Sequence, residues 1–377
     1  MAAKDGAVGT GFGDVDAALG GLITGDNVVW LGAPDELYAT LAAGFVGAAS
    51  AAARPGLVVA FGARRLTAID GAIRLDASAG GPFPRAVALA DEIERRVVAE
   101  QPSCLVIDNL AAVERRWGTD ALAAFFARIC PSMLDAGVTA YWSIDPGLGR
   151  GFVEHVRQIT QCLLDVRGAR LRVLKAEGRP EALQDISYRM TVTDDRIELT
   201  SPPAGGRLAR GLAAVRQQHG LNQHELAVIA GVTPSAISQA ESGVRGLSLD
   251  TVVTIADRLE IPVDRILAAA EPRGYRLARH DRTRRLAGGQ VAALSTDTAS
   301  GLRVYLVDLA GGEQGEPPFA HRGVSTVAAA RGLIQVELDA DRPVLRGGDV
   351  LIVETGEVRA WRNLRAQRAQ AFWVVRD

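Results

Sequence analysis

The spacing of apolar residues changes twice along this chain of 377 residues, and no single domain suits all three patterns. Up to about Thr200, short apolar runs alternate with stretches of helical spacing. Between Arg207 and Glu271 the spacing is helical throughout, and beyond Leu286 it has a period of two with glycine-rich turns. Because a compact domain usually holds about 100 to 200 residues, the sequence predicts a multidomain protein with three domains of different classes.

The first segment contains five apolar runs, each short enough for one buried strand: Val28 to Leu31, Leu57 to Phe61, Cys104 to Ile107, Val138 to Ile144 and Cys162 to Val166. Residues 85–100 and 120–136, which lie between runs, have helical spacing. Such alternation is typical of crossover connections. We therefore predict an α/β domain with a mostly parallel sheet over residues 1–200, ending in a β-hairpin around Asp194 and Asp195.

Two polar stretches separate the three segments. Residues 201–206 read SPPAGG, which neither a helix nor a central strand can continue. Residues 272–285 contain six arginines: Arg273, Arg276, Arg279, Arg282, Arg284 and Arg285. We predict two linkers here, the second a solvated charged tether or else a contact to a DNA backbone. They bound an all-α domain of five short helices at 207–271 and an all-β sandwich or barrel at 286–377.

Composition limits the classes of protein that fit. A formal net charge of −2 excludes a globally basic nucleic-acid coat protein but not a local basic surface. Cys104, Cys130 and Cys162 have no C-x-x-C spacing and lie in or beside apolar runs, so we expect buried free thiols in a reducing compartment. The N-terminus has no apolar signal core, and no run approaches about 18 apolar residues. We expect a cytoplasmic protein that does not associate with membranes.

The stretch NQHELAVIAGVTPSAISQAESG carries the most specific pattern in the chain. Asn222 and Glu225 have the spacing of a capping box at the start of a helix. Gly231 suits the left-handed residue that ends this helix, while Thr233 and Pro234 are typical of the N-cap and first residue of the next one. Two helices joined by so short a turn must cross steeply.

The second helix of this pair should have one buried and one polar face. Ile237 is expected to point inward with Val232. This leaves a short outer face, polar but uncharged, at the N-terminal end of the helix, formed by Pro234, Ser235, Ser238 and Gln239.

This pattern, Q-x-x-L-A-x-x-A-G-V-[ST]-x-x-x-I-S-x-x-E-x-G, resembles the helix-turn-helix domain of the phage Cro and C1 repressors (the XRE family), over about Leu208 to Leu267. The resemblance implies that Glu241 pairs internally with Arg216 and that Gln223 anchors a DNA phosphate. It also implies base contacts in the major groove, which suit a glutamine amide on adenine and serine hydroxyls. The implied DNA-binding residues are Gln223, Thr233, Pro234, Ser235, Ser238, Gln239 and Arg245.

An alternative is a helical module that dimerises or docks a partner without binding DNA. Acidic residues slightly outnumber basic ones in residues 207–271, which does not favour the phosphate attraction that supplies most DNA affinity.

The stretches GEPPFAHRGVSTV and LRGGDVLIVETGEVRAWRN resemble the two cupin motifs in order and spacing, over about Leu286 to Asp377. Of the histidines that bind metal in such cupins only His321 is present, with Gly323 and Arg359 at the positions of two others. One imidazole cannot hold a metal that needs about three protein ligands, so we predict no metal site. His321, Arg322, Arg359 and Trp361 are candidates for an effector pocket that selects a carboxylate or another anion. The alternative is a dimer-forming barrel with exposed arginines.

The stretch GTGFGDVDAALGGLITGDNVVWLGAPDELYATL resembles the RecA-like ATPases of the circadian-clock KaiC type. If a phosphate loop G-x-x-x-x-G-K-[ST] began at Gly32, Leu37, Tyr38 and Ala39 would replace its glycine, lysine and magnesium-binding hydroxyl. The Walker B strand CLVIDNL ends at Asp108, but AFGARR stands where the family has catalytic glutamates.

The resemblance therefore implies a degenerate nucleotide site made of Gly32, Tyr38 and Asp108, with no catalysis and no required cofactor. Asp108 is expected to cap a strand end. The domain would serve oligomerisation or signal reception, with a nucleotide-like ligand bound without turnover left open.

These features together predict a bacterial transcription regulator that is not an enzyme. It would bind a palindromic operator in double-stranded DNA as a homodimer, with non-catalytic RecA-like and cupin-like domains for oligomerisation or effector sensing. Two other functions fit parts of the sequence. One is a protein-binding scaffold or assembly factor; the other is a RecA-like ATPase acting on DNA, which the missing lysine disfavours.

Overall fold

The computed structural model describes residues 8–62, 66, 69, 71–179, 183–184, 186–193, 196–200, 205–242, 244–268, 277–280, 283–296 and 301–376. The chain divides into two compact units, Met1–Gly274 and Tyr275–Asp377. Buried apolar side chains of the described residues form two clusters within the α/β segment, one among the helices that follow and one in the second unit. Each of the three predicted segments therefore has a core of its own.

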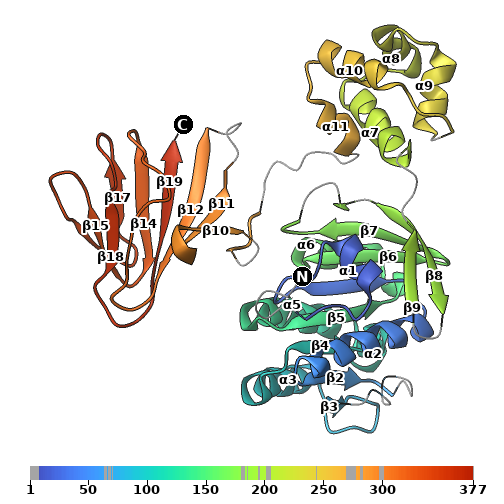
Figure 1. Ribbon diagram of the computed structural model, residues 1–377. Coiled ribbons are helices and arrows are strands. Elements are labelled where there is room, and N and C mark those ends of the chain that lie inside the picture. Colours follow the sequence, from blue (N-terminus) through green and yellow to red (C-terminus); the bar gives the residue numbers. More distant parts are fainter. Residues whose placement is uncertain are drawn as a thin grey trace. The chain divides into compact units, whose positions relative to one another are not determined.

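A nine-stranded sheet organises the α/β segment, in the order β3-β2-β4-β5-β1-β6-β7-β8-β9 (Figure 1). Six strands pair in parallel: β1 (Asn27–Leu31), β2 (Gly56–Ala60), β3 (Ala72–Asp76), β4 (Cys104–Ile107), β5 (Thr139–Ile144) and β6 (Cys162–Arg167). Three antiparallel strands extend the sheet: β7 (Arg170–Ala176), β8 (Ser187–Thr193) and β9 (Arg196–Thr200).

The predicted, mostly parallel sheet and its terminal hairpin β8–β9 are confirmed. Residues 194 and 195 lie outside the described residues. The strands β3 and β7 were not predicted, because charged residues interrupt the apolar ones in AIRLD, at the sheet edge, and in RLRVLKA, in an antiparallel pair. Only strands buried on both faces read as continuous apolar runs.

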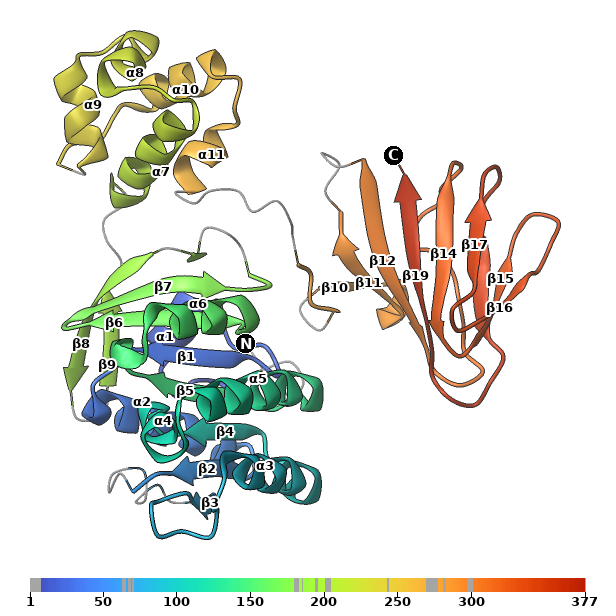
Figure 2. The same cartoon turned by 180° about the vertical axis from the view of Figure 1, so that it is seen from behind.

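Helices cover both faces of this sheet. Alternate residues of β1 point to opposite sides, so Val28 and Trp30 belong to one buried cluster and Val29 and Leu31 to the other. The first cluster includes α1 (Gly13–Leu19) and α2 (Asp35–Ala51). The second cluster, on the side seen in Figure 2, includes α3 (Ala86–Glu100), α4 (Ala111–Trp117), α5 (Thr119–Ala136) and α6 (Arg150–Ile159).

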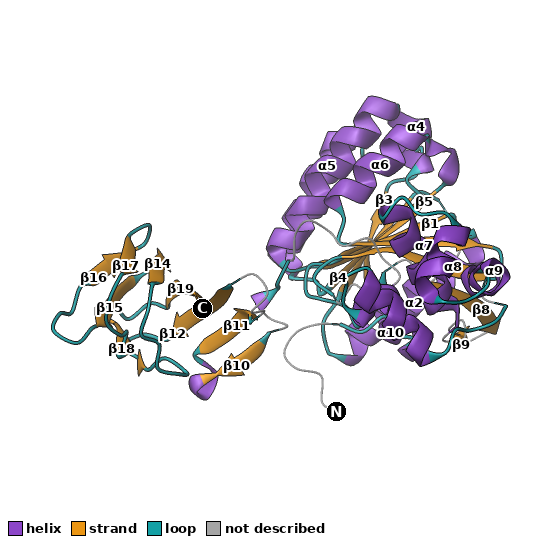
Figure 3. Cartoon of the chain, turned by 90° about the horizontal axis from the view of Figure 1, so that it is seen from above, coloured by secondary structure: helices purple, strands orange, loops and turns teal. Residues whose placement is uncertain are grey.

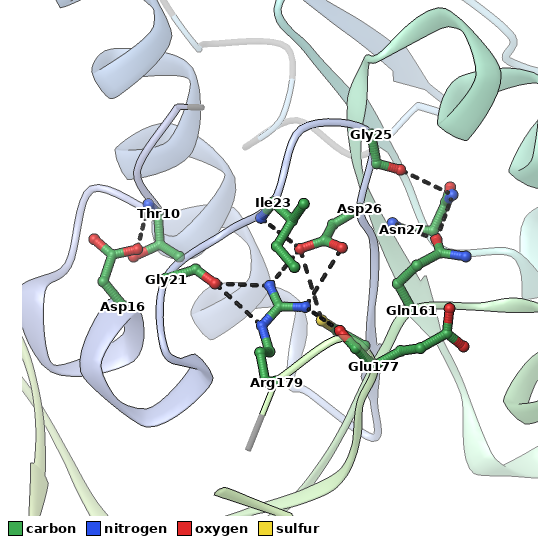
Figure 4. Close-up of polar contacts among 11 residues, drawn as sticks. Thr10, Asp16, Gly21, Ile23, Gly25, Asp26, Asn27, Gln161, Glu177 and Arg179 are labelled. Carbon is green, nitrogen blue, oxygen red and sulfur yellow. Dashed lines mark hydrogen bonds and ion pairs between the residues drawn. The ribbon is translucent and has the colours of Figure 1, made fainter. Parts of the chain in front are cut away.

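A buried ion pair ties the segment before β1 to the chain after β7 (Figure 4). The side chains of Asp26 and Arg179 are 2% and 0% exposed. Arg179 binds the Asp26 carboxylate and donates to the carbonyls of Gly21 at 2.7 Å and Glu177 at 3.0 Å. The carboxylate also accepts from the backbone N–H of Ile23 at 2.7 Å. Both buried charges are therefore paired and hydrogen-bonded, as such groups must be.

Five helices follow the sheet, as predicted: α7 (Gly205–Gln218), α8 (Gln223–Ala230), α9 (Pro234–Glu241), α10 (Leu249–Arg258) and α11 (Val263–Ala268). Their shared core includes Leu212, Leu226, Ile237 and Ile255, none of which is exposed to solvent. Helix α7 begins at Gly205, inside the stretch 201–206 that was predicted as a linker. Residues 201–204 lie outside the described residues.

The second unit is built from two antiparallel sheets, which agrees with the predicted sandwich or barrel (Figure 3). The six-stranded sheet has the order β10-β11-β12-β19-β14-β17, and the four-stranded sheet has the order β13-β18-β15-β16. Their strands are β10 (Arg284–Leu286), β11 (Val291–Ser295), β12 (Leu302–Leu309), β13 (Gln314–Gly315), β14 (Ser325–Arg331), β15 (Leu333–Glu337), β16 (Val344–Arg346), β17 (Val350–Val353), β18 (Ala360–Asn363) and β19 (Ala369–Arg376).

The end of the predicted basic linker, 272–285, needs correction. Arg284 and Arg285 belong to β10, where they pair with Ala293 and Ala292 of β11. β10 is an edge strand, and edge strands accommodate charged side chains that a central strand would exclude. Of the other arginines assigned to this linker, Arg273, Arg276 and Arg282 lie outside the described residues.

Candidate nucleic-acid interface

Helix α8 begins and ends as its sequence predicts. The Asn222 side chain accepts from the backbone N–H of Glu225 at 2.9 Å, and the Glu225 carboxylate accepts from the backbone N–H of Asn222 at 2.7 Å. This reciprocal capping box satisfies two N–H groups that the first turn leaves unpaired. At the other end, Gly231 has φ 67° and ψ 30°, the left-handed conformation that favours glycine.

Helix α9 starts three residues after Gly231, with Val232 and Thr233 between them. The hydroxyl of Thr233 accepts from the backbone N–H of Ala236 at 3.2 Å, and Pro234 occupies the first helical position. Ile237 and Ala240 face the core with 0% and 2% exposure. The predicted short turn between two helices is confirmed, and it holds the start of α9 at the surface.

A buried carboxylate joins three helices beneath this surface. Glu241 of α9 accepts from Nε of Arg216 in α7 at 2.6 Å, and its side chain is 8% exposed. The predicted Arg216–Glu241 pair is therefore confirmed. Glu241 also accepts from the amide of Gln223 in α8 at 2.8 Å, a bond that the sequence did not predict. Because these bonds join α7, α8 and α9, they hold α9 in a fixed orientation relative to the other two helices.

The residues predicted to read bases lie on the exposed side of α9. Side chains of Ser235, Ser238 and Gln239 are all exposed. Gln239 donates to the hydroxyl of Ser235 at 3.4 Å, since residues four apart are neighbours on one helix face. Thr233 and Pro234 at the helix start and Arg245 just beyond its end are exposed as well.

The acidic residues of this domain are not on that face. Glu225 is part of the α8 cap, and Glu241 is paired internally. The remaining acids among the described residues belong to α10, α11 and the turn between them: Asp250, Asp257, Glu260 and Asp264. Acidic residues slightly outnumber basic ones in this domain, but none of the carboxylates lies among the exposed residues of α9.

The loop predicted to be a degenerate phosphate loop is short and carries charges of the wrong sign for a phosphate. Gly32 has φ 73°, and a side chain there would meet the carbonyl of Val166 at 2.9 Å, so the turn requires glycine. Pro34 has no N–H to offer an anion, and α2 begins at Asp35 with Asp35 and Glu36 in its first turn. Since the N-terminus of a helix is where anions bind, two carboxylates there repel a phosphate.

Tyr38 lies in the core at the position that the resemblance assigns to lysine. Its ring is 2% exposed, and its hydroxyl donates to the carbonyl of Ile107 at 2.6 Å. Burial, and to a lesser degree the charge of Asp108, raise the pKa of Tyr38 well above its usual value. The phenol is therefore neutral and serves packing.

Asp108, at the end of β4, has the capping role predicted for it. It accepts from the backbone N–H of Phe61 at 3.1 Å and from that of Asn109 at 2.7 Å.

The predicted effector pocket is not gathered as expected. Arg322 lies 3.6 Å from Glu357, and Arg359 lies 2.6 Å from Asp339. Each guanidinium thus has a carboxylate partner already, which lessens its attraction for a further anion.

His321 and Trp361 are also in different surroundings. A ring nitrogen of His321 lies 3.4 Å from the carbonyl of Val324, whereas Trp361 is 1% exposed in the core. A polar cavity of about 240 Å³ does border Trp361, but the other predicted residues do not line it; its lining is Gln314, Gln335, Glu337, Arg342, Ala360, Trp361 and Arg362.

Within the described ranges, no group of three or more histidine, cysteine, aspartate or glutamate side chains has the arrangement of a metal site. Cys104, Cys130 and Cys162 are free and buried, as predicted. Burial raises the pKa of the Cys104 and Cys130 thiols to about 12. None of the helices in the described ranges combines the length and the apolar run required to cross a bilayer.

Comparison with known proteins identifies the helical segment. A family model described as Helix-turn-helix (HTH_3) matches residues 212–266, from α7 to α11. The crystal structure of an HTH_3 family transcriptional regulator from Vibrio cholerae matches with 17% identity over 46% of this chain and 96% of that chain, at a TM-score of 0.23. A search of curated proteins found no match. Given the family match and the geometry of α8 and α9, residues 212–266 form an HTH_3-type helix-turn-helix domain.

Proposed function

We propose that this protein is a sequence-specific, DNA-binding transcription regulator. The observation that carries the proposal is the exposed, uncharged polar face of α9, held in place by the Arg216–Glu241–Gln223 bonds and free of acidic side chains. A helix presented in this way can enter the major groove with its N-terminal residues against base edges.

Base reading would depend on the exposed face of α9. Gln239 can bond an adenine at N6 and N7, and the hydroxyls of Ser235 and Ser238 can donate or accept. Gln223 and Arg245 would contact the phosphate backbone, which positions the domain without selecting a sequence.

Two copies would read a palindromic operator. Recognition helices related by a two-fold axis meet half-sites about 34 Å apart, one turn of the double helix. Such a regulator would act in the cytoplasm, where its operator lies.

The α/β domain would be a RecA-like fold without catalysis. Asp35 and Glu36 at the start of α2, and the burial of Tyr38, support this proposal because they remove the phosphate site and the position of its lysine. The second unit, proposed to be cupin-like, would sense an effector or join two copies. Magnesium-dependent ATP hydrolysis by the purified chain would contradict the non-catalytic assignment.

The decisive experiment is selection of genomic fragments by the purified full-length protein, followed by sequencing, at near-physiological and at raised salt. We expect enrichment of one palindromic motif. The affinity for DNA should fall steeply as salt rises, because protein binding releases counterions from the DNA and this release is less favourable at high salt. If a well-folded protein enriched no motif, this result would refute sequence-specific DNA binding and favour the scaffold function.

A further inference from the structure

The two sheets of the second unit differ on their outer faces. In the four-stranded sheet, outward residues are mainly polar or charged, as expected of a face in water. They comprise Gln314, Gln335, Glu337, Arg346 and Arg362 beside Leu333, Val344 and Ala360.

The six-stranded sheet does not follow this rule over its central strands. Four neighbouring strands, β12, β19, β14 and β17, present what we call the outer apolar face: Val304, Thr326, Ala328, Val350, Ile352, Phe372 and Val374. Polar and charged residues of β12 and β19 appear only toward the ends of the same rows, at Asp308, Gln370 and Arg376.

Three of these seven side chains are exposed and the other four are half-buried, and none belongs to the core cluster of the unit. Leu306, which the register places on the same side of β12, is 5% exposed. Val350 is 58% exposed, Ile352 62% and Phe372 40%. Their neighbours Val327 and Trp373, which point to the other side of the same strands, are each 1% exposed and belong to the core. A contiguous apolar surface on a sheet face usually marks an interaction site.

We infer that the outer apolar face packs against the same face of a second copy of this chain. In a two-fold interface each patch meets its own copy, so a charge near the centre would meet a like charge. The outer apolar face carries no charge at any of its seven positions, which suits pairing with itself. Two such faces would stack about 10 Å apart, as sheets do in a sandwich.

Pairing through the edge of the sheet is less suited to this unit. β17 is the edge strand next to β14, and it is flanked by Asp349 and Glu354. Antiparallel pairing of two β17 strands about their centre would bring Asp349 of one copy opposite Glu354 of the other, and like charges opposite each other destabilise a sheet. The contact is therefore expected through the face.

The first test measures self-association of the full-length protein by sedimentation velocity over a wide range of concentration. The variant Ile352→Lys places a charge in the outer apolar face, while Gln335→Lys places one on the outer face of the other sheet. We expect the parent and Gln335→Lys to form dimers and Ile352→Lys to dissociate about a hundredfold more readily, because each dimer would bury two unpaired charges. Circular dichroism checks that both variants are folded.

The second test locates the contact directly. The variants Ile352→Cys and Gln335→Cys are made in the full-length protein, and each variant is treated with a thiol reagent near neutral pH. The native cysteines are buried and should stay unreactive. We expect Cys introduced at position 352 to be protected at high protein concentration and exposed on dilution, and the one at position 335 to react under both conditions.

Three results would overturn the inference: a monomeric parent, equal reactivity at both positions in the associated protein, or protection at position 352 that does not change with dilution. The last result would mean that another part of the same chain covers the face. The inference does not rest on DNA binding, since a protein that fails these tests can still enrich an operator motif.

Discussion

Gln223 donates its side-chain amide to the carboxylate of Glu241 over 2.8 Å. Because an amide nitrogen has two hydrogens, this bond leaves one for a phosphate and fixes the orientation of the group. The residue that the family resemblance assigns to the DNA backbone is thus held by the same carboxylate that binds Arg216. Correct placement of Gln223 depends on α9 as well as on α8.

Replacement of Gln239 by alanine should reduce discrimination at one base position by about 1 to 3 kcal/mol, since a paired base edge would lose its partner. Gln223→Ala should instead weaken binding to all sequences alike. The measurement is binding to operators that differ at single positions, with Gln217→Ala as a control, because Gln217 is an exposed glutamine on α7. Unchanged discrimination by Gln239→Ala would show that α9 is not the reading helix.

Replacement of Glu241 by glutamine keeps the shape of the side chain but removes the charge that pairs with Arg216, whose side chain is only 17% exposed. We expect a loss of about 2 kcal/mol in the local stability of the helical domain, seen as faster hydrogen exchange of amides in α8 and α9. Glu260→Gln, at an exposed position after α10, is the matched control. Equal exchange in the two variants would mean that Glu241 does not hold the helices together.

Replacement of Tyr38 by phenylalanine should destabilise the α/β domain by about 1 to 2 kcal/mol, because the buried carbonyl of Ile107 loses its donor. Tyr141→Phe is an informative control: its buried hydroxyl has no hydrogen-bond partner among the described residues, so its removal should be neutral or stabilising. Hydrogen exchange of amides in β1 and β4 measures both effects. Similar losses in the two variants would contradict the role given to the Tyr38 bond.

Replacement of Asp26 by asparagine should cost about 3 to 5 kcal/mol, because it leaves the fully buried guanidinium of Arg179 without its countercharge. The double variant Asp26→Leu with Arg179→Met should be closer to the parent, since it removes both charges. Chemical unfolding of the parent and the two variants, followed in the α/β domain, compares their free energies of unfolding. A double variant no more stable than Asp26→Asn would argue against charge compensation as the role of the pair.

The acid stability of α3 should depend on Glu92. Hydrogen bonds from Arg95 and then Arg96 lower the pKa of Glu92 from 4.5 to about 2. A lowered folded-state pKa means that this carboxylate contributes stability above pH 4.5, and that the contribution is lost as the pH falls towards 2.

Hydrogen exchange of α3 amides should therefore distinguish the parent from Glu92→Gln at neutral pH, and the difference should vanish in acid. Glu198→Gln, at an exposed position of β9, should show no such step. A difference between the parent and Glu92→Gln that persists at low pH would exclude the charged bonds as its cause.

Much of the helical domain was predictable because its signals are local. The capping box of Asn222 and Glu225, the left-handed Gly231 and the Thr233 N-cap each involve groups within a few residues of one another. The main strands of the parallel sheet were predictable for a similar reason, since a strand buried on both faces is a continuous apolar run.

The candidate site was predictable where a family pattern named its residues, as at Arg216 and Glu241. It was not predictable where contacts depend on the fold, as for the arginines of the supposed effector pocket. Arg322 and Arg359 read as free cations in the sequence, and only the folded chain places carboxylates beside them.

By itself, the sequence determined the main parallel strands, the five helices that follow the sheet, how α8 and α9 begin and end, and which residues α9 exposes. Tertiary structure alone decided the order of the strands, the bond from Gln223 to Glu241, the pairing of Asp26 with Arg179 across 153 residues, and the outer apolar face. The physical reason is that capping and periodicity depend on neighbours along the chain, whereas these contacts join residues that become neighbours only when the chain has folded.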